Sequence, residues 1–270
     1  MVLQFVFIIV LFCCFGFLAT RIGRFPGKKW SIGFFLGLLI LIVVNLPKFC
    51  PYLINFAVYQ ALSTNNIDMI LVGIAGIIAI VPCLSKLSRT NTKYLVTCFL
   101  IVTLIRSSLL PAACSILNKN ELSSLTCRID EDGIYLQSTP YTCGPAALAT
   151  VLNAFGISDT ESNIALSTGC NSYSGTRSID LVNYINSRYG NELTAKYAYI
   201  TDIDSLLKID ALFIAEVRAS VFTDHFVAII SINEKTITIG DPSYGKFEAH
   251  LAGFNREWRH KVIVIQKKIS

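Results

Sequence analysis

Hydrophobic and polar positions divide the chain into two parts with different patterns. Up to about residue 117, long apolar runs without charge dominate, whereas beyond it apolar residues recur at the short spacings of amphipathic helices and strands. The first pattern predicts an all-α transmembrane region over residues 1–117. The second predicts an α+β domain over residues 131–270, joined to the first part by a linker at 118–130.

Three apolar runs in the first part are expected to span a membrane, at residues 2–20, 30–46 and 69–85. Each is close to the roughly 17 to 25 residues that a helix needs to cross a bilayer. A fourth run, at about 94–117, carries Arg106 near its middle, where an arginine costs roughly 2.5 to 3.5 kcal/mol on insertion. The apolar segment 49–62 is short, which predicts an interfacial or re-entrant segment.

Basic residues set the expected orientation of these spans. The Lys and Arg residues that follow the first and third spans are Arg21, Arg24, Lys28, Lys29, Lys86, Arg89 and Lys93. By the positive-inside rule both loops are cytoplasmic, so four spans place the C-terminal domain on the exported face of the cytoplasmic membrane. If Arg106 prevents the fourth crossing, the domain is cytosolic instead.

The C-terminal periodicity predicts short helices and an antiparallel sheet. An apolar helical face starts at Cys143 and ends near Gly156, and further helices are expected at 160–168 and 178–189. Alternating or β-branched runs predict strands at 193–200, 211–219, 225–232, 236–240 and 261–266.

Composition and charge agree with this division. The chain is 53% hydrophobic, which is high for a soluble protein of 270 residues and predicts the lipid bilayer as a partner. Its net charge of +5 combines ten Lys and Arg against one Asp up to residue 119 with thirteen against seventeen acidic residues beyond it. The basic balance therefore reflects topology signals, and no nucleic-acid partner is expected. Four spans exceed what an anchor needs, which suggests a membrane partner or export machinery, with Arg106 as a candidate contact.

The segment QSTPYTCGPAAL, residues 137–148, carries the candidate chemistry. Cys143 opens the apolar helix, and the unpaired N–H groups and dipole of a helix N-terminus favour a thiolate there. Gln137 lies six positions ahead, where its amide can stabilise an oxyanion together with the backbone N–H of Cys143. A lone cysteine at this position would more often be structural, so its partners decide its role.

His225 and Asp241 are the candidate partners, and they flank two β-branched runs that predict a hairpin. If its loop has an odd number of residues, both side chains fall on one face of the sheet, directly opposite or diagonal. Asp224, the alternative carboxylate, would point to the opposite face as the sequence neighbour of His225. An imidazole held by a carboxylate beside a thiol is the arrangement of a cysteine hydrolase.

With these residues the chain resembles the C39 family of papain-like cysteine peptidases, known as leader-peptide-cleaving domains of bacteriocin-exporting ABC transporters. The resemblance covers about residues 131–266 and rests on Gln137, the Cys-Gly-Pro-Ala-Ala run at Cys143, His225 in HFVAI and Asp241 in GDPSYG. The Gly-Thr turn at 175–176 is also similar. It implies Cys143 as nucleophile, His225 as general base, Asp241 as the residue that orients His225, and Gln137 as oxyanion donor.

The resulting prediction is a membrane-anchored cysteine peptidase that cleaves a peptide or protein substrate and needs no cofactor or metal. A small-residue or double-glycine cleavage site is implied only by the resemblance, and no P-loop is present to power export. Two alternatives stay open: a thiol-dependent transpeptidase or amidase, and a non-catalytic peptide-binding module of an export system. On the exported face, Cys127 and Cys170 could form a disulfide that leaves Cys143 free.

Overall fold

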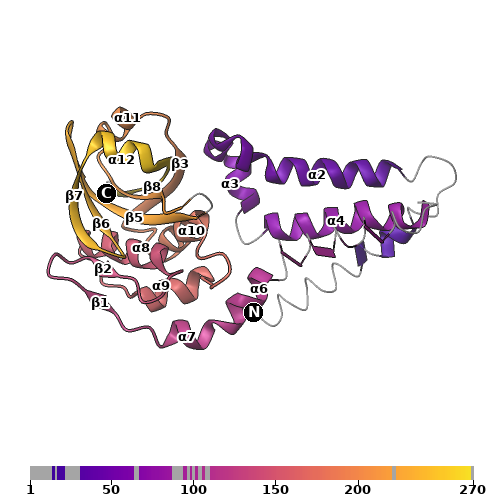
Figure 1. Ribbon diagram of the computed structural model, residues 1–270, viewed down its shortest axis with the longest axis horizontal. Coiled ribbons are helices and arrows are strands. Elements are labelled where there is room, and N and C mark those ends of the chain that lie inside the picture. Colours follow the sequence, from indigo (N-terminus) through magenta and orange to yellow (C-terminus); the bar gives the residue numbers. More distant parts are fainter. Residues whose placement is uncertain are drawn as a thin grey trace. The chain divides into compact units, whose positions relative to one another are not determined.

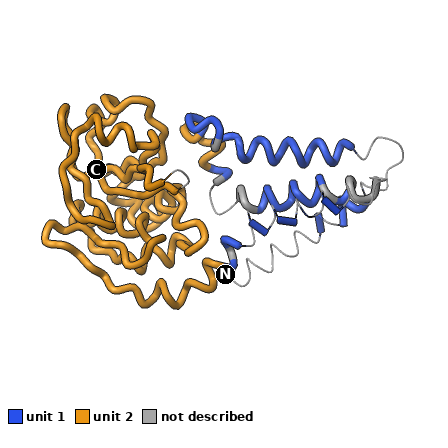
Figure 2. Tube along the Cα trace, in the orientation of Figure 1, with its two compact units in different colours: residues 1–53, 61–113 blue, residues 54–60, 114–270 orange. Residues whose placement is uncertain are grey.

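The computed structural model describes residues 14–15, 17–21, 31–63, 67–86, 94–95, 98, 101–102, 105–106, 110–220 and 223–268. The chain forms two compact units (Figure 2). The first comprises residues 1–53 and 61–113, and the second comprises residues 54–60 and 114–270.

Two helices account for most of the described part of the first unit. They are α2, Ser31–Phe49, and α4, Ile67–Lys86, and they pack side by side (Figure 1). Gly37 of α2 permits a close approach, because a Cβ there would lie 2.6 Å from the carbonyl oxygen of Ala75. The 3-10 helix Pro51–Asn55 and α3, Ala57–Ser63, follow α2.

The transmembrane predictions agree with this structure only in part. The runs at 30–46 and 69–85 are helical, as α2 and α4. Among the residues described, however, no helix is both long enough and apolar enough to cross a membrane, so these two spans are not supported. Most of the run at 2–20 lies outside the described residues, as do residues 96–97, 99–100, 103–104 and 107–109 of the run at 94–117.

The second unit contains a six-stranded antiparallel sheet with the strand order β3-β8-β4-β5-β6-β7. Its strands are β3, Leu193–Tyr199; β4, Leu212–Arg218; β5, Asp224–Ile232; β6, Thr236–Asp241; β7, Gly245–His250; and β8, Trp258–Lys267. A separate two-stranded sheet pairs β1, Arg128–Ile129, with β2, Tyr135–Leu136. This architecture confirms the α+β prediction and the five strands expected from periodicity.

Helices cover both faces of the six-stranded sheet (Figure 1). The helices α8, Cys143–Ala154, and α10, Ser178–Arg188, pack against one face, and α9, Glu161–Thr168, packs against both of them. The short helices α11, Ile203–Leu207, and α12, Leu251–Glu257, contribute Leu206, Leu251 and Phe254 to the cluster on the other face. Alternate strand residues belong to these two cores: Ala228 lies in the α8 cluster, and its neighbours Val227 and Ile229 lie in the other.

The segment before residues 131–270 also belongs to this unit from residue 114 on. The helices α6, Leu110–Leu117, and α7, Lys119–Ser123, lead into it, and Leu122 of α7 is buried against Ala165 and Cys170. Residues 54–60 add a contact at the free edge of β3. The side-chain amide of Asn55 accepts from the backbone N–H of Tyr199 at 2.7 Å and donates to its carbonyl at 2.9 Å. These bonds satisfy backbone groups that an edge strand would otherwise expose.

Candidate active site

Cys143 is the first residue of α8, as the sequence predicts, and it is half-buried. The preceding Thr142 is buried, and its hydroxyl accepts from the backbone N–H of Thr139 at 3.1 Å, which closes a tight loop before the helix. Gly144 lets α8 pack closely, since a Cβ there would lie 3.3 Å from atoms of Leu181, Phe226 and Thr176. The thiol is therefore presented at a helix N-terminus whose backbone is fixed on both sides.

His225 and Asp241 come together from neighbouring strands. Nε2 of His225 lies 2.8 Å from Oδ1 of Asp241, and the Asp241 side chain is buried. The same carboxylate oxygen accepts from the backbone N–H of Ser243 at 2.7 Å, so the turn after β6 fixes it. Asp224, the alternative carboxylate, instead pairs with Arg259 at 2.7 Å.

The protonation of His225 reflects this environment. Burial lowers the pKa of His225, but hydrogen bonds and charge at Asp241 and Cys143 outweigh that effect and raise the pKa from 6.5 to about 9. Because Nε2 faces Asp241, Nδ1 is the ring nitrogen available to exchange a proton with Cys143. The structure thus brings the predicted thiol, imidazole and carboxylate into one interacting set.

Gln137 lies in the loop that leads to Cys143, between β2 and α8. Its backbone N–H donates to the carbonyl of Pro242 at 2.8 Å, which ties this loop to the turn after Asp241. Its carbonyl accepts from the Arg128 guanidinium at 2.9 Å. The side-chain oxygen of Gln137 is buried and has no hydrogen-bond partner among the residues described.

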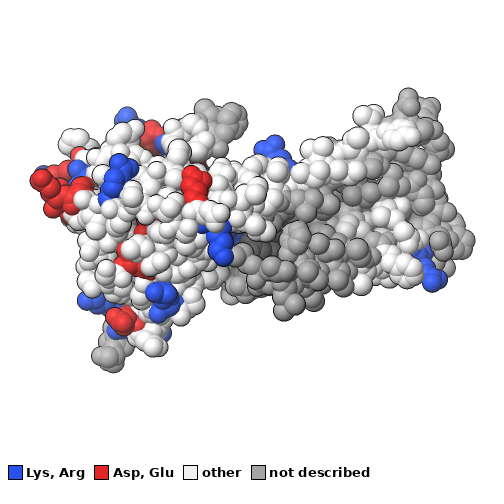
Figure 3. Space-filling model, turned by 90° about the horizontal axis from the view of Figure 1, so that it is seen from below, with Lys and Arg blue, Asp and Glu red and all other residues white. Residues whose placement is uncertain are grey.

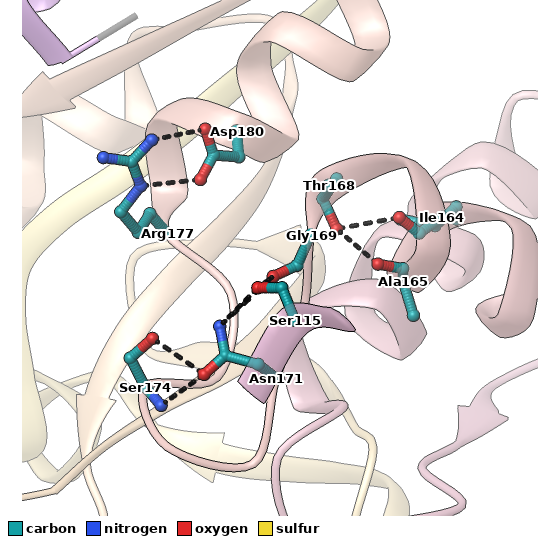
Figure 4. Close-up of polar contacts among 9 residues, drawn as sticks. All are labelled: Ser115, Ile164, Ala165, Thr168, Gly169, Asn171, Ser174, Arg177 and Asp180. Atoms are coloured by element: carbon teal, nitrogen blue, oxygen red, sulfur yellow. Dashed lines mark hydrogen bonds and ion pairs between the residues drawn. The ribbon is translucent and has the colours of Figure 1, made fainter. Parts of the chain in front are cut away.

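The Gly-Thr turn at 175–176 lies against this loop, since a Cβ on Gly175 would be 3.6 Å from the Tyr141 carbonyl. Its positive φ of 66° is a conformation that glycine adopts readily. Asn171 holds the turn: its side-chain oxygen accepts from the backbone and hydroxyl of Ser174, and its amide nitrogen donates to Ser115 and Gly169 (Figure 4). The turn then leads into α10, where Arg177 pairs with Asp180 at 2.7 Å (Figure 4).

Cys127 and Cys170 are free thiols in the structure, so the disulfide considered for them is not formed. Cys127 is exposed, whereas Cys170 is buried and donates to the Tyr141 carbonyl at 3.3 Å. Burial raises the pKa of the Cys170 thiol to about 12. Of the three cysteines in the C-terminal part, Cys143 alone lies beside a histidine and carboxylate pair.

Other parts of the described structure offer less chemistry. No group of three or more His, Cys, Asp or Glu side chains is placed to hold a metal ion within the described ranges. A surface pocket of about 380 Å³ lies between α11 and β5, and none of the four predicted site residues lines it. Acidic and basic side chains are intermingled on the face of the second unit that Figure 3 shows.

One residue that supports the loop between Gln137 and Cys143 could not be recognised from the sequence. Glu161, the first residue of α9, is buried, and its two carboxylate oxygens accept from the backbone N–H and the hydroxyl of Ser138. An acidic residue in the first turn of a helix is ordinarily a solvated contribution to the helix dipole. Only the fold reveals that this carboxylate faces the residue after Gln137.

Two relatives match about half of the chain. A protein from Methanothermobacter thermautotrophicus is 29% identical over 147 residues, which cover 54% of this chain and 97% of that protein. A protein from Methanothermobacter marburgensis is 28% identical over 151 residues, covering 55% of this chain and 98% of that protein. Both are described as uncharacterized.

Two solved structures are also similar to about half of the chain. The peptidase domain of Streptococcus ComA, a bifunctional ABC transporter involved in quorum sensing, is 19% identical, with a TM-score of 0.44 over 49% of this chain and 96% of that one. A double glycine motif protease from an AMS/PCAT transporter, solved with its leader peptide, is 20% identical, with a TM-score of 0.42 over 53% of this chain and 93% of that one.

The family match carries the assignment. The Peptidase C39 family matches residues 132–270, which is half of the chain and contains Cys143, His225, Asp241 and Gln137. The chain therefore belongs to the Peptidase C39 family and is a cysteine peptidase.

Proposed function

We propose that this peptidase cleaves a peptide or protein substrate by covalent catalysis at Cys143, with His225 as the acid and base. The contact between His225 and Asp241, 2.8 Å long and buried, is the observation that carries the proposal. It fixes the ring so that Nδ1 is available to Cys143. Because the pKa of His225 is raised to about 9, the imidazole is protonated at neutral pH and can pair with a thiolate.

The proposed reaction has two steps. The Cys143 thiolate attacks the scissile carbonyl carbon, the C–N bond breaks, and the proton on His225 passes to the leaving amine. His225 then takes a proton from water, the hydroxide oxygen attacks the thioester, and the thiolate leaves. Gln137 and the backbone N–H of Cys143 stabilise the oxyanion in both steps. Asp241 holds the imidazole and does not itself change protonation.

The substrate class is proposed from the family. A peptide with a small-residue cleavage site such as Gly-Gly is the first candidate, the motif named for the protease of the AMS/PCAT transporter. Membership in a peptidase family sets aside the non-catalytic binding module. No observation favours the transpeptidase or amidase alternative, and product analysis separates it from hydrolysis.

The test is a cleavage assay with leader-type peptides that contain Gly-Gly, followed by mass spectrometry of the products with and without added glycinamide. Wild-type protein should release a fragment ending in Gly-Gly with a free carboxylate, and Cys143→Ala should release none. A product that carries glycinamide in place of the carboxylate would instead support the transpeptidase. Uncut peptide with a wild type that is folded would contradict the Gly-Gly substrate class.

The membrane location remains a proposal from the sequence. Apolar side chains along α2, such as Ile32, Phe35 and Leu39, are exposed, and exposed apolar surface of this kind commonly binds lipid or a partner. Alkaline extraction of cell membranes tests the attachment, since an inserted chain stays in the pellet. A protease added to intact cells tests the side, because a domain on the exported face is digested before lysis.

A further inference from the structure

We propose that Glu161 is a positioning residue for the peptidase reaction, which acts by fixing the backbone that carries the Gln137 amide. The inference rests on the proposed function, because it takes Gln137 as an oxyanion donor. Glu161 itself touches neither the thiol nor the imidazole in the contacts described for it. It acts through Ser138, the residue that follows Gln137.

The first observation is the burial of a carboxylate without a cation. Glu161 is 1% exposed, and no basic side chain forms an ion pair with it in the part of the chain that the structure describes. A buried carboxylate is costly unless hydrogen bonds and nearby dipoles stabilise it. Its position at the first residue of α9 supplies a favourable helix dipole.

The second observation is where its hydrogen bonds go. Oε1 of Glu161 accepts from the backbone N–H of Ser138 at 2.8 Å, and Oε2 accepts from the Ser138 hydroxyl at 2.6 Å. Both oxygens therefore hold one residue of the loop. Charge-assisted bonds of this kind are about twice as strong as neutral ones, so the contact is well suited to immobilise a backbone.

The third observation concerns Gln137 itself. Its backbone N–H donates to the Pro242 carbonyl at 2.8 Å, and the backbone N–H of its neighbour Ser138 donates to Glu161. Two consecutive peptide groups are therefore fixed, one by the turn after β6 and the other by the start of α9. The side-chain oxygen of Gln137 has no hydrogen-bond partner among the residues described. The position of the amide is therefore set from the backbone. Glu161 supplies one of its fixed points, beside the Pro242 carbonyl and the Arg128 guanidinium that donates to the Gln137 carbonyl at 2.9 Å.

Asp159 offers a matched control two residues away. It is also a buried carboxylate, but it accepts from the hydroxyls of Tyr184 and Tyr189 and from the backbone N–H of Thr160. It joins the start of α9 to α10 and makes no described contact with the loop at 137–142. Asp159→Asn should therefore lower stability without changing the behaviour of Gln137.

The test compares two reactions of Cys143 in the full-length protein, each followed by peptide mapping. Acylation by p-nitrophenyl acetate forms a thioester, expels p-nitrophenolate and passes through a tetrahedral oxyanion, whereas alkylation by iodoacetamide displaces iodide without one. The ratio of the two rates reports the oxyanion site and requires no knowledge of the peptide substrate. The ratio is measured for wild type, Gln137→Ala, Glu161→Gln, the double variant and Asp159→Asn.

We expect Gln137→Ala to lower the ratio by roughly 100-fold, the usual effect of removing one oxyanion donor. Glu161→Gln should lower it about tenfold in the wild type and leave it unchanged in Gln137→Ala, because the two residues act in one path. Alkylation by iodoacetamide and the Asp159→Asn ratio should stay within about twofold of wild type. Ser138→Ala removes the hydroxyl bond to Glu161, and with it the 3.0 Å contact of that hydroxyl with the Thr126 carbonyl, but keeps the backbone N–H bond to Glu161. It should give a smaller decrease and serves as the test if Glu161→Gln does not fold.

The failures are distinguishable. Equal effects of Glu161→Gln in both backgrounds, or no effect in a folded variant, would overturn the role of Glu161 and leave the proposed function intact. An unchanged ratio in Gln137→Ala would overturn the role of Gln137 as an oxyanion donor, and with it the positioning role of Glu161. Absence of Cys143 acylation in the wild type would contradict the proposed nucleophile itself.

Discussion

His225 and Asp241 contact each other across β5 and β6 because a bulge changes the register between the two strands. Near the turn, Ile232 pairs with Ile237 and Ser231 with Thr238, whereas beyond the bulge Ile229 pairs with Ile239 and Ala228 with Gly240. Continuing the second register sets Asp241 opposite Val227, diagonal to His225 and on the same face. Continuing the first would set Asp241 opposite Ala228, on the face away from His225.

The register between β5 and β6 is therefore predicted to be essential for activity. Insertion of one alanine between Ala228 and Ile229 should set Asp241 opposite Ala228, on the face away from His225, and lower the rate by up to roughly 10⁴-fold, as loss of the orienting carboxylate does in other triads. Peptide cleavage by the insertion variant measures this effect. Ile230→Ala keeps the bulge and the register and should cleave within a few-fold of wild type. Equal activity of the two variants would show that the register does not matter.

The pH dependence of cleavage should carry the signature of His225. Its folded pKa of about 9 is above its ordinary value of 6.5, so the imidazolium persists at neutral pH and is lost as the pH rises through 9. We expect kcat/KM to fall on the alkaline side near pH 9. Asp241→Asn should move this decrease to lower pH, because the amide stabilises imidazolium less well. An alkaline limb at the same pH in both proteins would contradict this assignment.

The same shift predicts a pH-dependent stability. A group whose pKa is raised by folding stabilises the protein fully below its unfolded value of 6.5, and this contribution disappears as the pH rises through about 9. The free energy of unfolding of wild type should therefore decrease from pH 6 to pH 10 by more than that of His225→Ala. Urea denaturation at the two pH values measures the difference, and equal decreases would argue against a raised pKa.

The cysteines of the C-terminal part should differ in their reaction with iodoacetamide. Cys143 is half-buried beside His225 and Cys127 is exposed, whereas Cys170 is buried and its pKa is raised to about 12. In the folded protein Cys143 and Cys127 should be alkylated, and Cys170 should react only after denaturation. Peptide mapping by mass spectrometry locates each modification. Early modification of Cys170 would show that its packing against Leu122 and Ala165 opens readily.

Packing of α8 is expected to determine the stability of the second unit. Leu148 is fully buried, so Leu148→Ala should lower the free energy of unfolding by about 2 to 5 kcal/mol. Tyr244→Ala, at a position that is 86% exposed, should change it by no more than about 0.5 kcal/mol. Urea denaturation followed by the fluorescence of buried Trp258 reports on this unit. Comparable losses in both variants would indicate that α8 is not part of the cooperative core.

Sequence patterns predicted the elements whose side chains alternate clearly between core and solvent. The α8 helix with its Ala and Leu face and the strands β3, β4, β5, β6 and β8 all follow from periodicity. The strand β7, GKFEAH, escaped prediction because it is an edge strand whose residues are largely exposed. The apolar runs at 30–46 and 69–85 likewise gave the helices α2 and α4, but among the described residues no helix is long and apolar enough to cross a membrane.

The candidate site was predictable to the extent that its chemistry is encoded by residue type. The thiol at a helix start and the His and Asp on one hairpin were visible, but the bulge that brings Asp241 to the face of His225 was not. The contact from Glu161 to Ser138 joins residues 23 positions apart, and the pair from Asn55 to Tyr199 joins residues 144 apart. Such contacts depend on tertiary packing, which no local pattern specifies.

The central claim is that Cys143 forms a covalent acyl-enzyme with the help of His225. The most direct measurement is intact-protein mass spectrometry after wild type is mixed with a Gly-Gly peptide that it cleaves and the reaction is quenched rapidly with acid. Wild type should carry the mass of the N-terminal fragment on Cys143 as a thioester, His225→Ala should accumulate little of it, and Cys143→Ser should carry no thioester. Cleavage at the wild-type rate by Cys143→Ala would contradict the account.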